Sequence, residues 1–159
     1  MAFVIVRAAA YATLFIGFLL VFLPRRILTA SGIVRPAAVG PWEMVGIILG
    51  AAGALLALWC ILTFVTVGKG TPAPFDPPRR LVASGPYRYL RNPMYLGAGL
   101  ALGGAALFYR SLALLIYVVL FLGVTHVFVV LYEEPTLARL FGADYTAYRA
   151  RVHRWVPWY

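Results

Sequence analysis

Two adjacent acids, Glu133 and Glu134, are the residues of this sequence most suited to chemistry. They follow an apolar run, at the point where the carbonyl end of a helix carries partial negative charge and the hydrocarbon edge raises the cost of any further charge. A pair of carboxylates in that position favours a cation nearby. The alternative explanation is a solvated polar boundary to a membrane span, because acids are common at membrane interfaces.

The C-terminal tail supplies possible partners for these acids. At about 100 degrees per residue, a helix from Tyr145 to about Trp155 places Tyr145, Tyr148 and Trp155 on one stripe. Arg151 borders this stripe and is expected to turn inward, whereas Arg154 is expected to point away toward lipid phosphates. The competing interpretation is an amphipathic helix that only anchors the chain at the membrane interface.

One histidine and one cysteine lie within apolar runs. His126 has no second histidine, cysteine or acid at ligand spacing, so we expect packing or hydrogen bonding from it and no metal site. Cys60 is the only cysteine of the chain, which excludes an intrachain disulfide and predicts a small buried core residue.

The composition places the chain in a membrane. Of its 159 residues, 63% are hydrophobic and 12% are charged, with a mean hydropathy of +0.87, whereas soluble domains carry roughly a quarter charged residues. The net charge of +9 comes from basic residues that flank apolar runs. This distribution indicates topology signals and contacts with anionic headgroups, and it argues against a nucleic-acid partner.

Four apolar runs predict an all-α, polytopic membrane protein with about four transmembrane helices and a cytosolic C-terminal amphipathic helix that Asp144 caps. The runs are Val4–Leu23, Trp42–Val67, Met94–Phe108 and Leu112–Tyr132. The sequence Pro24-Arg25-Arg26 is expected to close the first run, for which a secretory signal peptide is the competing interpretation. Pro41 and Glu43 suit the first turn of the second helix.

Small residues and prolines organise the segments between these helices. Gly46, Gly50 and Ala54 recur every four residues and predict one smooth face for helix packing. The loop from Gly68 to Asn92 carries five prolines between Pro72 and Pro86, which forbid a continuous helix. Because this loop also holds apolar side chains, we expect it to fold back onto the membrane surface.

The distribution of basic residues predicts the orientation. With four spans, ten of the fourteen lysines and arginines lie on the side of the N-terminus, the long loop and the tail, and four lie on the opposite side. The long loop, the active site and both termini are therefore expected to face the cytosol.

Three ordered blocks closely resemble the isoprenylcysteine carboxyl methyltransferase and phospholipid methyltransferase superfamily of integral membrane methyltransferases. The blocks are residues 85–97, residues 133–137 and residues 141–157, and the resemblance covers about residues 68–157. It implies an S-adenosylmethionine (SAM) pocket built from the last two spans, the preceding loop and the tail. Asn92 stands where the family more often has histidine, so the chain offers no imidazole at that position.

The resemblance implies the site residues. Those expected to bind the cofactor are Tyr87, Tyr89, Leu90, Arg91, Asn92, Pro93, Tyr95, Gly97, Gly99, Glu133, Glu134, Tyr145 and Tyr148. Those expected to be catalytic are Arg91, Glu133 and Arg151. The chemistry of these side chains agrees with a SAM site, because carboxylates and tyrosine rings attract the positively charged sulfonium and ammonium groups of SAM. Methyl transfer is an in-line displacement that requires alignment and exclusion of water more than acid–base groups.

We therefore expect one membrane domain over residues 1–159, with an N-terminal two-helix hairpin (1–67) and a SAM-binding catalytic half (68–159). The expected reaction transfers a methyl group to a lipophilic or lipid-anchored acceptor such as a prenylcysteine carboxylate, a phospholipid amine or a thiol. The sequence leaves open the choice among O-, N- and S-methylation, the oligomeric state, the membrane and the role of His126. The alternatives are an NADPH-dependent membrane reductase, whose C-terminal cofactor region is somewhat similar, and a non-enzymatic scaffold or transport subunit.

Overall fold

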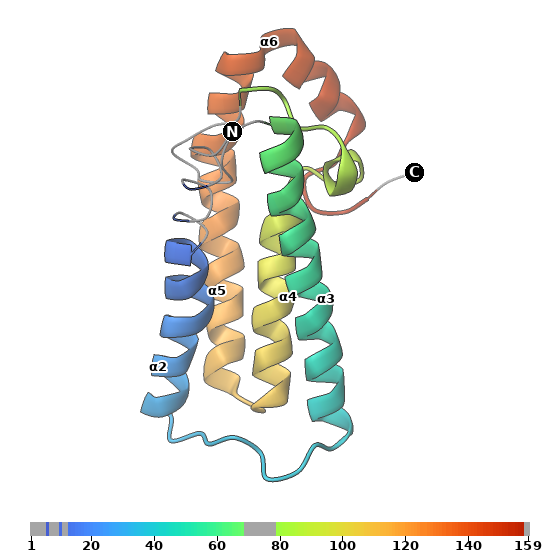
Figure 1. Ribbon diagram of the computed structural model, residues 1–159. Helices are drawn as coiled ribbons and strands as arrows, with labels where there is room; N and C mark the ends of the chain where they lie inside the picture. The colour runs from blue at the N-terminus through green and yellow to red at the C-terminus, as the bar shows by residue number, and fades with distance from the viewer. Residues whose placement is uncertain (1–5, 7–9, 11–12, 69–78, 158–159) are drawn as a thin grey trace.

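The structure is a computed structural model that describes residues 6, 10, 13–68 and 79–157. The elements, in chain order, are η1 (Ile16–Phe22), α2 (Leu23–Ala30), α3 (Pro41–Thr63), η2 (Phe64–Gly68), η3 (Gly85–Arg88), α4 (Pro93–Phe108), α5 (Leu112–Phe128), η4 (Val129–Glu133) and α6 (Glu134–Arg151). Here η1, η2 and η4 are π-helical turns, and η3 is a 3-10 helix. Helices α2 to α5 form a bundle, and α6 crosses one end of it (Figure 1).

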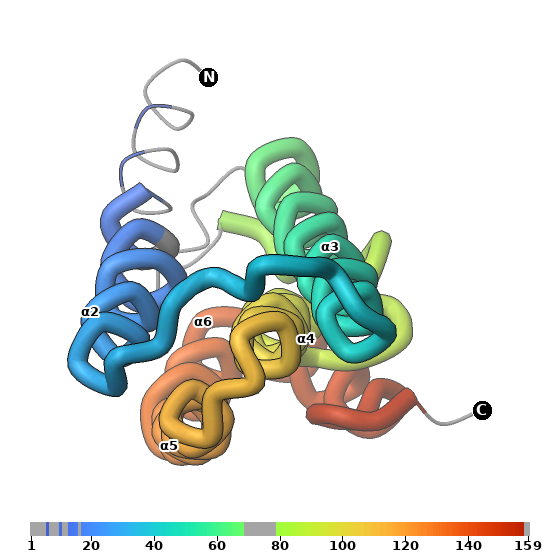
Figure 2. The backbone as a smooth tube through the Cα atoms, turned by 90° about the horizontal axis from the view of Figure 1, so that it is seen from below, coloured from blue at the N-terminus to red at the C-terminus, as the bar shows by residue number. Residues whose placement is uncertain are grey.

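Three helical stretches are long and apolar enough to cross a membrane. They are Thr13–Ala30, Pro41–Gly68 and Leu112–Arg151. Helix α4 has 16 residues and is about 24 Å long, less than the roughly 30 Å of a hydrocarbon core. Figure 2 shows α4 in the middle of the bundle, between α2, α3 and α5. The predicted all-α membrane protein is thus confirmed, with three full-length spans and one shorter, enclosed helix.

Glycines set the closest interface of the bundle, between α3 and α4. A Cβ atom on Gly46 would lie 2.6 Å from the carbonyl oxygen of Gly104, and one on Gly53 would lie 2.5 Å from that of Gly97. Since real Cβ atoms do not approach backbone this closely, the helices can meet here only without side chains. The predicted packing face is confirmed at Gly46, but Ala54 is exposed and Gly53 takes its place.

Replacing Gly104 by alanine is expected to destabilise this interface. The added Cβ would overlap the backbone of Gly46 and Gly50, which cannot give way as a flexible side chain could, so we expect a loss of about 1 to 3 kcal/mol. The measurement is thermal unfolding in one detergent. Gly123→Ala is the matched control, because nothing lies within 4 Å of its Cβ position. Equal unfolding temperatures for the two variants would contradict the packing role.

Two prolines lie inside continuous helices, contrary to expectation. The first apolar helix does not close at Leu23 but continues through Pro24 to Ala30, and the fourth continues past Pro135 to Arg151. Each proline follows a π-helical turn, η1 or η4, and the Glu134 amide bonds to the carbonyl of Val129. The wider turn shifts the hydrogen-bond pattern where a proline ring would clash in an α-helix. Glu134 therefore keeps helical angles (φ −61°, ψ −44°).

The predicted tail helix is wrong at its C-terminal end. Helix α6 begins at Glu134, turns at Gly142 (φ 50°, ψ −119°) and ends at Arg151, where Val152 becomes extended. The break at Gly142 divides α6 into two helical segments, and the second begins close to Asp144, near the predicted start. The left-handed φ at Gly142 is accessible to glycine at little cost and redirects the chain across the end of the bundle. Residues after Arg151 are therefore not helical, and this determines where the side chain of Arg154 lies.

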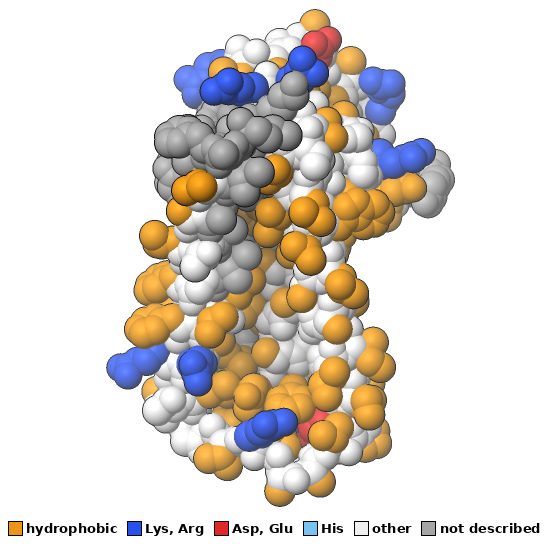
Figure 3. Space-filling view, viewed as in Figure 1, with side chains coloured by type: hydrophobic (Ala, Val, Ile, Leu, Met, Phe, Trp, Pro, Cys, Tyr) orange, Lys and Arg blue, Asp and Glu red, His pale blue; other side chains and the backbone are white. Residues whose placement is uncertain are grey.

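The two ends of the bundle differ in what they hold. The segment from Leu81 to Asn92 and α6 lie at one end, and the turn between α4 and α5 lies at the other (Figure 1). At that far end Glu43 accepts hydrogen bonds from the Gly40 amide (2.9 Å) and from Arg110 Nε (2.7 Å). Glu43 opens α3 as expected and also ties it to the neighbouring turn. Basic side chains gather at both ends, with a largely apolar flank between them (Figure 3).

Candidate active site

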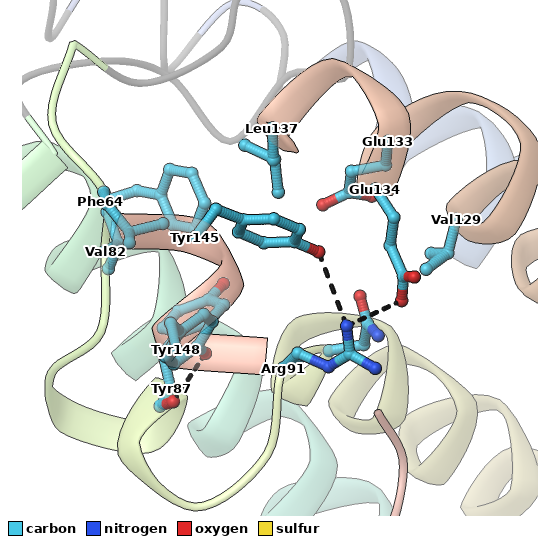
Figure 4. Close-up of a pocket in the computed structure, with 12 residues that line it drawn as sticks. Phe64, Val82, Tyr87, Arg91, Val129, Glu133, Glu134, Leu137, Tyr145 and Tyr148 are labelled. Carbon is cyan, nitrogen blue, oxygen red and sulfur yellow. Dashed lines mark hydrogen bonds and ion pairs between the residues drawn. The ribbon is translucent and has the colours of Figure 1, made fainter. Parts of the chain in front are cut away.

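A pocket lies where α6 crosses the end of the bundle (Figure 4). Its walls come from η2, the segment before α4, η4 and α6. Seven of the predicted site residues line it, namely Tyr87, Arg91, Asn92, Glu133, Glu134, Tyr145 and Tyr148. The structure thus brings together residues that are up to about sixty positions apart in the sequence, and it mixes two acids, one arginine and three tyrosines around one space.

Glu134 is the centre of a network of charges. Its Oε1 atom lies 3.1 Å from Arg91 Nη1 and 2.7 Å from Arg154 Nε, and its Oε2 atom lies 3.0 Å from Arg154 Nη2. The residue is only 7% exposed, so a solvated polar boundary does not describe it. Two arginines therefore neutralise and fix this carboxylate.

Glu133 has different surroundings. Its Oε2 atom accepts a hydrogen bond from the Tyr95 hydroxyl at 3.1 Å, and within the described residues no arginine or lysine pairs with it. In Figure 4 its carboxylate points away from Arg91 and toward the side of the pocket formed by Leu137 and Tyr145. Glu133 is thus the acid of the pocket that has no cationic partner among the described residues, and it suits a cationic ligand.

Tyrosines fix the floor of the pocket. The Tyr148 hydroxyl donates to the carbonyl oxygen of Tyr87 at 2.7 Å, and Tyr87 packs with Cys60 and Val82 in a buried cluster. Burial raises the pKa of the Tyr87 hydroxyl well above its usual value, which keeps the phenol neutral at physiological pH. Arg91 Nη1 lies 3.5 Å from the Tyr145 hydroxyl. The cluster confirms that Cys60 is a core residue and that the described part of the loop packs onto the bundle.

The tail returns to the pocket after α6 ends. The Arg91 amide donates to the carbonyl of His153 (2.9 Å), and Asn92 Nδ2 donates to the carbonyl of Arg154 (3.2 Å). These bonds place the Arg154 side chain next to Glu134. The hydrogen bond to Glu134 raises the pKa of the Arg154 guanidinium. Asn92 is 5% exposed, and its side-chain amide donates to the tail.

The expected orientation of the two tail arginines is wrong. Arg151 is exposed, and its Nε atom donates to the carbonyl of Ala147 in its own helix at 3.3 Å, whereas Arg154 reaches Glu134. The helical stripe assumed a helix to Trp155, but the helix ends at Arg151, so the spacing of 100 degrees per residue does not apply beyond it. The catalytic role predicted for Arg151 has no contact in the pocket to support it.

Six other predicted residues do not line the pocket. Tyr89 is 43% exposed, Leu90 and Pro93 are buried, and Tyr95 lies behind Glu133. Gly97 and Gly99 face neighbouring helices: a Cβ atom on Gly97 would meet the backbone of α3, and one on Gly99 would meet the side chain of Leu122. The structure gives these two glycines a packing role, and their cofactor role stays a prediction.

Sequence reasoning missed the apolar part of the lining. It consists of Phe64, Leu81, Val82, Val129 and Leu137. Leu81 and Val82 carried a usable signal, since they are apolar residues in a loop too rich in proline for a helix. Phe64 and Val129 lie in apolar helical runs, where a side chain that lines a pocket cannot be distinguished by type from one that faces lipid. Leu137 lies in the block of residues 133–137 that resembles the family, but it was not selected as a site residue.

A family model described as phospholipid methyltransferase matches residues 42–144. The matched region begins in the first turn of α3 and ends within α6. It includes the pocket residues up to Leu137 but stops before Tyr145, Tyr148 and the tail that carries Arg154. Comparisons with curated proteins and with solved structures found no match.

Proposed function

The chain belongs to the phospholipid methyltransferase family, because the family match covers more than half of its residues, and on that premise we propose that it is a SAM-dependent methyltransferase whose acceptor is lipophilic. The membership supports a membrane-embedded methyltransferase. The cofactor, the acceptor and the orientation in the membrane are parts of the proposal.

The observation that carries the proposal is the unequal pairing of the two acids. Glu134 is held by Arg91 and Arg154, whereas Glu133 faces the pocket with Tyr95 as its partner. SAM is a cation with an additional carboxylate, and the pocket offers groups of both kinds. Glu133 and the faces of Tyr145 and Tyr148 suit its positive groups. Arg91 Nε is a buried donor with no partner among the described residues, and it suits the carboxylate.

The donor set therefore fits SAM, which when bound supplies a methyl group attached to a positively charged sulfur. The residues of the chain act by position. Arg91 and Arg154 hold Glu134 in place, Tyr148 fixes the backbone at Tyr87, and the apolar walls exclude water from the reacting groups. Alignment in a dry site is the main requirement of an in-line displacement.

The place of the pocket supports a lipophilic acceptor. It lies at one end of the apolar bundle (Figure 1), and we propose that an acceptor dissolved in the bilayer enters it laterally. A prenylcysteine carboxylate, a phospholipid amine and a lipophilic thiol all meet this condition. We propose such an acceptor and the surrounding membrane lipids as the partners of the chain.

The test is a methylation assay with purified protein in lipid bilayers, isotopically labelled SAM and a lipid extract. We expect saturable binding of SAM and transfer of label to the lipid fraction, where the product can be identified by mass spectrometry. Binding of NADPH without SAM would instead indicate a reductase. A protein that binds neither cofactor would be a scaffold or transport subunit, and the proposal would be wrong.

Glu133→Gln is expected to weaken SAM binding by about tenfold to a hundredfold while the protein still folds. Loss of a partly desolvated charge pair costs about 1.5 to 3 kcal/mol, and Gln retains the size of the side chain and its bond from Tyr95. Glu134→Gln is expected to weaken binding too, with an added loss of stability because two arginines lose their carboxylate. Binding is measured by titration with labelled SAM. Asp144→Asn, at the exposed acid of α6, is the control and should leave the affinity unchanged.

A cysteine placed at Ala150 is expected to react with an impermeant thiol reagent only from the cytosolic side of sealed vesicles. The reason is the excess of basic residues on that side of the bundle, and Thr71, which lies outside the described residues, should behave in the same way. Val34 is 82% exposed and lies at the opposite end of the bundle. A cysteine placed at Val34 should therefore react only from the other side of the membrane. Labelling of Ala150 and Val34 from the same side would contradict the orientation.

A further inference from the structure

His126 is a polar side chain on the exposed flank of α5 that the proposed function leaves unused. It is exposed on the flank of α5, about 10 Å before Glu133 along the helix. Its Nδ1 atom accepts a hydrogen bond from Trp155 Nε1 at 3.0 Å, and the two rings lie 6.0 Å apart. An imidazole on an apolar flank requires a polar partner, because lipid chains supply none. Trp155 is that partner.

Trp155 adds a contact to those that anchor the tail segment Val152–Trp155, among which are the bonds of the Arg154 side chain itself. Two others are the bonds from the Arg91 amide to His153 and from Asn92 to the carbonyl of Arg154. The segment is no longer helical, so these tertiary bonds replace the helical ones. They bracket Arg154, whose backbone is held on one side by Asn92 and whose next residue is held by His126.

The position of Arg154 matters because of where its side chain lies. The guanidinium makes two bonds to Glu134, of 2.7 Å and 3.0 Å, and Glu134 is also the partner of Arg91 in the pocket. A tail that moved away from α5 would carry Arg154 off Glu134 and leave Arg91 as the remaining cation on that carboxylate.

We infer that His126 is a positioning residue of the active site. By accepting the hydrogen bond of Trp155 on the lipid-facing side of α5, it fixes the tail and so holds Arg154 on Glu134. His126 makes no contact with the pocket and takes no part in the chemistry. The inference rests on the proposed function for its effect on SAM, but the contact itself can be tested without any cofactor.

The first arm of the test is hydrogen exchange in bilayers, read at the Arg91 amide that bonds to His153. His126→Phe removes the acceptor but keeps a ring, and it should speed exchange at this amide. His126→Gln retains an acceptor for Trp155 and should restore protection. Val124→Phe, at another exposed position of α5, should leave exchange unchanged. Equal exchange in the wild-type protein and His126→Phe would overturn the anchor.

The second arm is SAM affinity. We expect His126→Phe to weaken binding by threefold to tenfold and His126→Gln to bind nearly as the wild type does. If His126 acts through Arg154, His126→Phe should have no further effect in an Arg154→Ala background. Additive effects, or faster exchange with unchanged affinity, would overturn the positioning role. A wild-type protein that binds no SAM would instead refute the proposed function, and the exchange arm would still decide the anchor.

Discussion

Arg91→Ala is expected to lower the rate of methyl transfer by at least about a hundredfold. The side chain is 11% exposed and lies 3.1 Å from Glu134 and 3.5 Å from the Tyr145 hydroxyl. Truncating one partner of a buried, hydrogen-bonded charge pair costs about 2 to 5 kcal/mol. Glu134 keeps its two bonds from Arg154, so we take a loss of about 3 kcal/mol, which in a rate is already more than a hundredfold. The loss also removes the Nε donor that we assign to the cofactor. Initial rates with labelled SAM measure the effect.

Arg88→Ala is the matched control for this variant. Arg88 stands one turn earlier, it is exposed, and its guanidinium lies 5.1 Å from the centre of the Tyr89 ring. It contributes similar charge to the same surface without contact to the pocket, so its removal should leave the rate within about twofold of the wild type, as expected for surface substitutions. Equal rates for Arg91→Ala and Arg88→Ala would refute the place of Arg91 in the site.

The membrane helices could be predicted from the sequence because the signal is local. A run of about 20 apolar residues satisfies the bilayer wherever it occurs, so the cores of α3 and α5 were predictable without any tertiary information. The continuation of two helices through Pro24 and Pro135 could not be predicted in this way. Proline normally ends or kinks a helix, and only a preceding π-helical turn, which depends on hydrogen bonds several residues away, accommodates it here.

The site was predictable where residue type alone carried the chemistry. The acids Glu133 and Glu134 at a helix end, and Arg91 in a block of tyrosines, were identified from their sequence and lie in one pocket. The sequence did not predict that Glu134 is paired with arginines while Glu133 is not, because this difference depends on Arg154. Arg154 reaches Glu134 because the helix α6 ends at Arg151 and the tail then bonds to the segment before α4. Such long-range contacts leave no periodic signal.

The two tail arginines provide the sharpest test of this geometry. Arg154→Ala is expected to reduce turnover by about tenfold to a hundredfold, whereas Arg151→Ala should retain activity within about twofold. Truncating one partner of a buried, hydrogen-bonded charge pair costs about 2 to 5 kcal/mol. The lower part of that range applies, because Glu134 keeps its contact with Arg91. Arg151 is exposed, and among the described residues its side chain bonds to Ala147 of its own helix, so its removal leaves the carboxylate untouched.

The comparison separates a role in the site from an electrostatic attraction to lipid. If the tail only anchors the protein, each arginine contributes about 1 kcal/mol of attraction to anionic headgroups, and the two alanine variants should behave alike. Turnover and SAM affinity are measured for both variants in the same bilayers, with thermal unfolding to show that each is folded. Because the two residues are three positions apart and carry the same charge, a difference between them comes from the contact of Arg154 with Glu134. Equal activities would refute that contact as a part of the site.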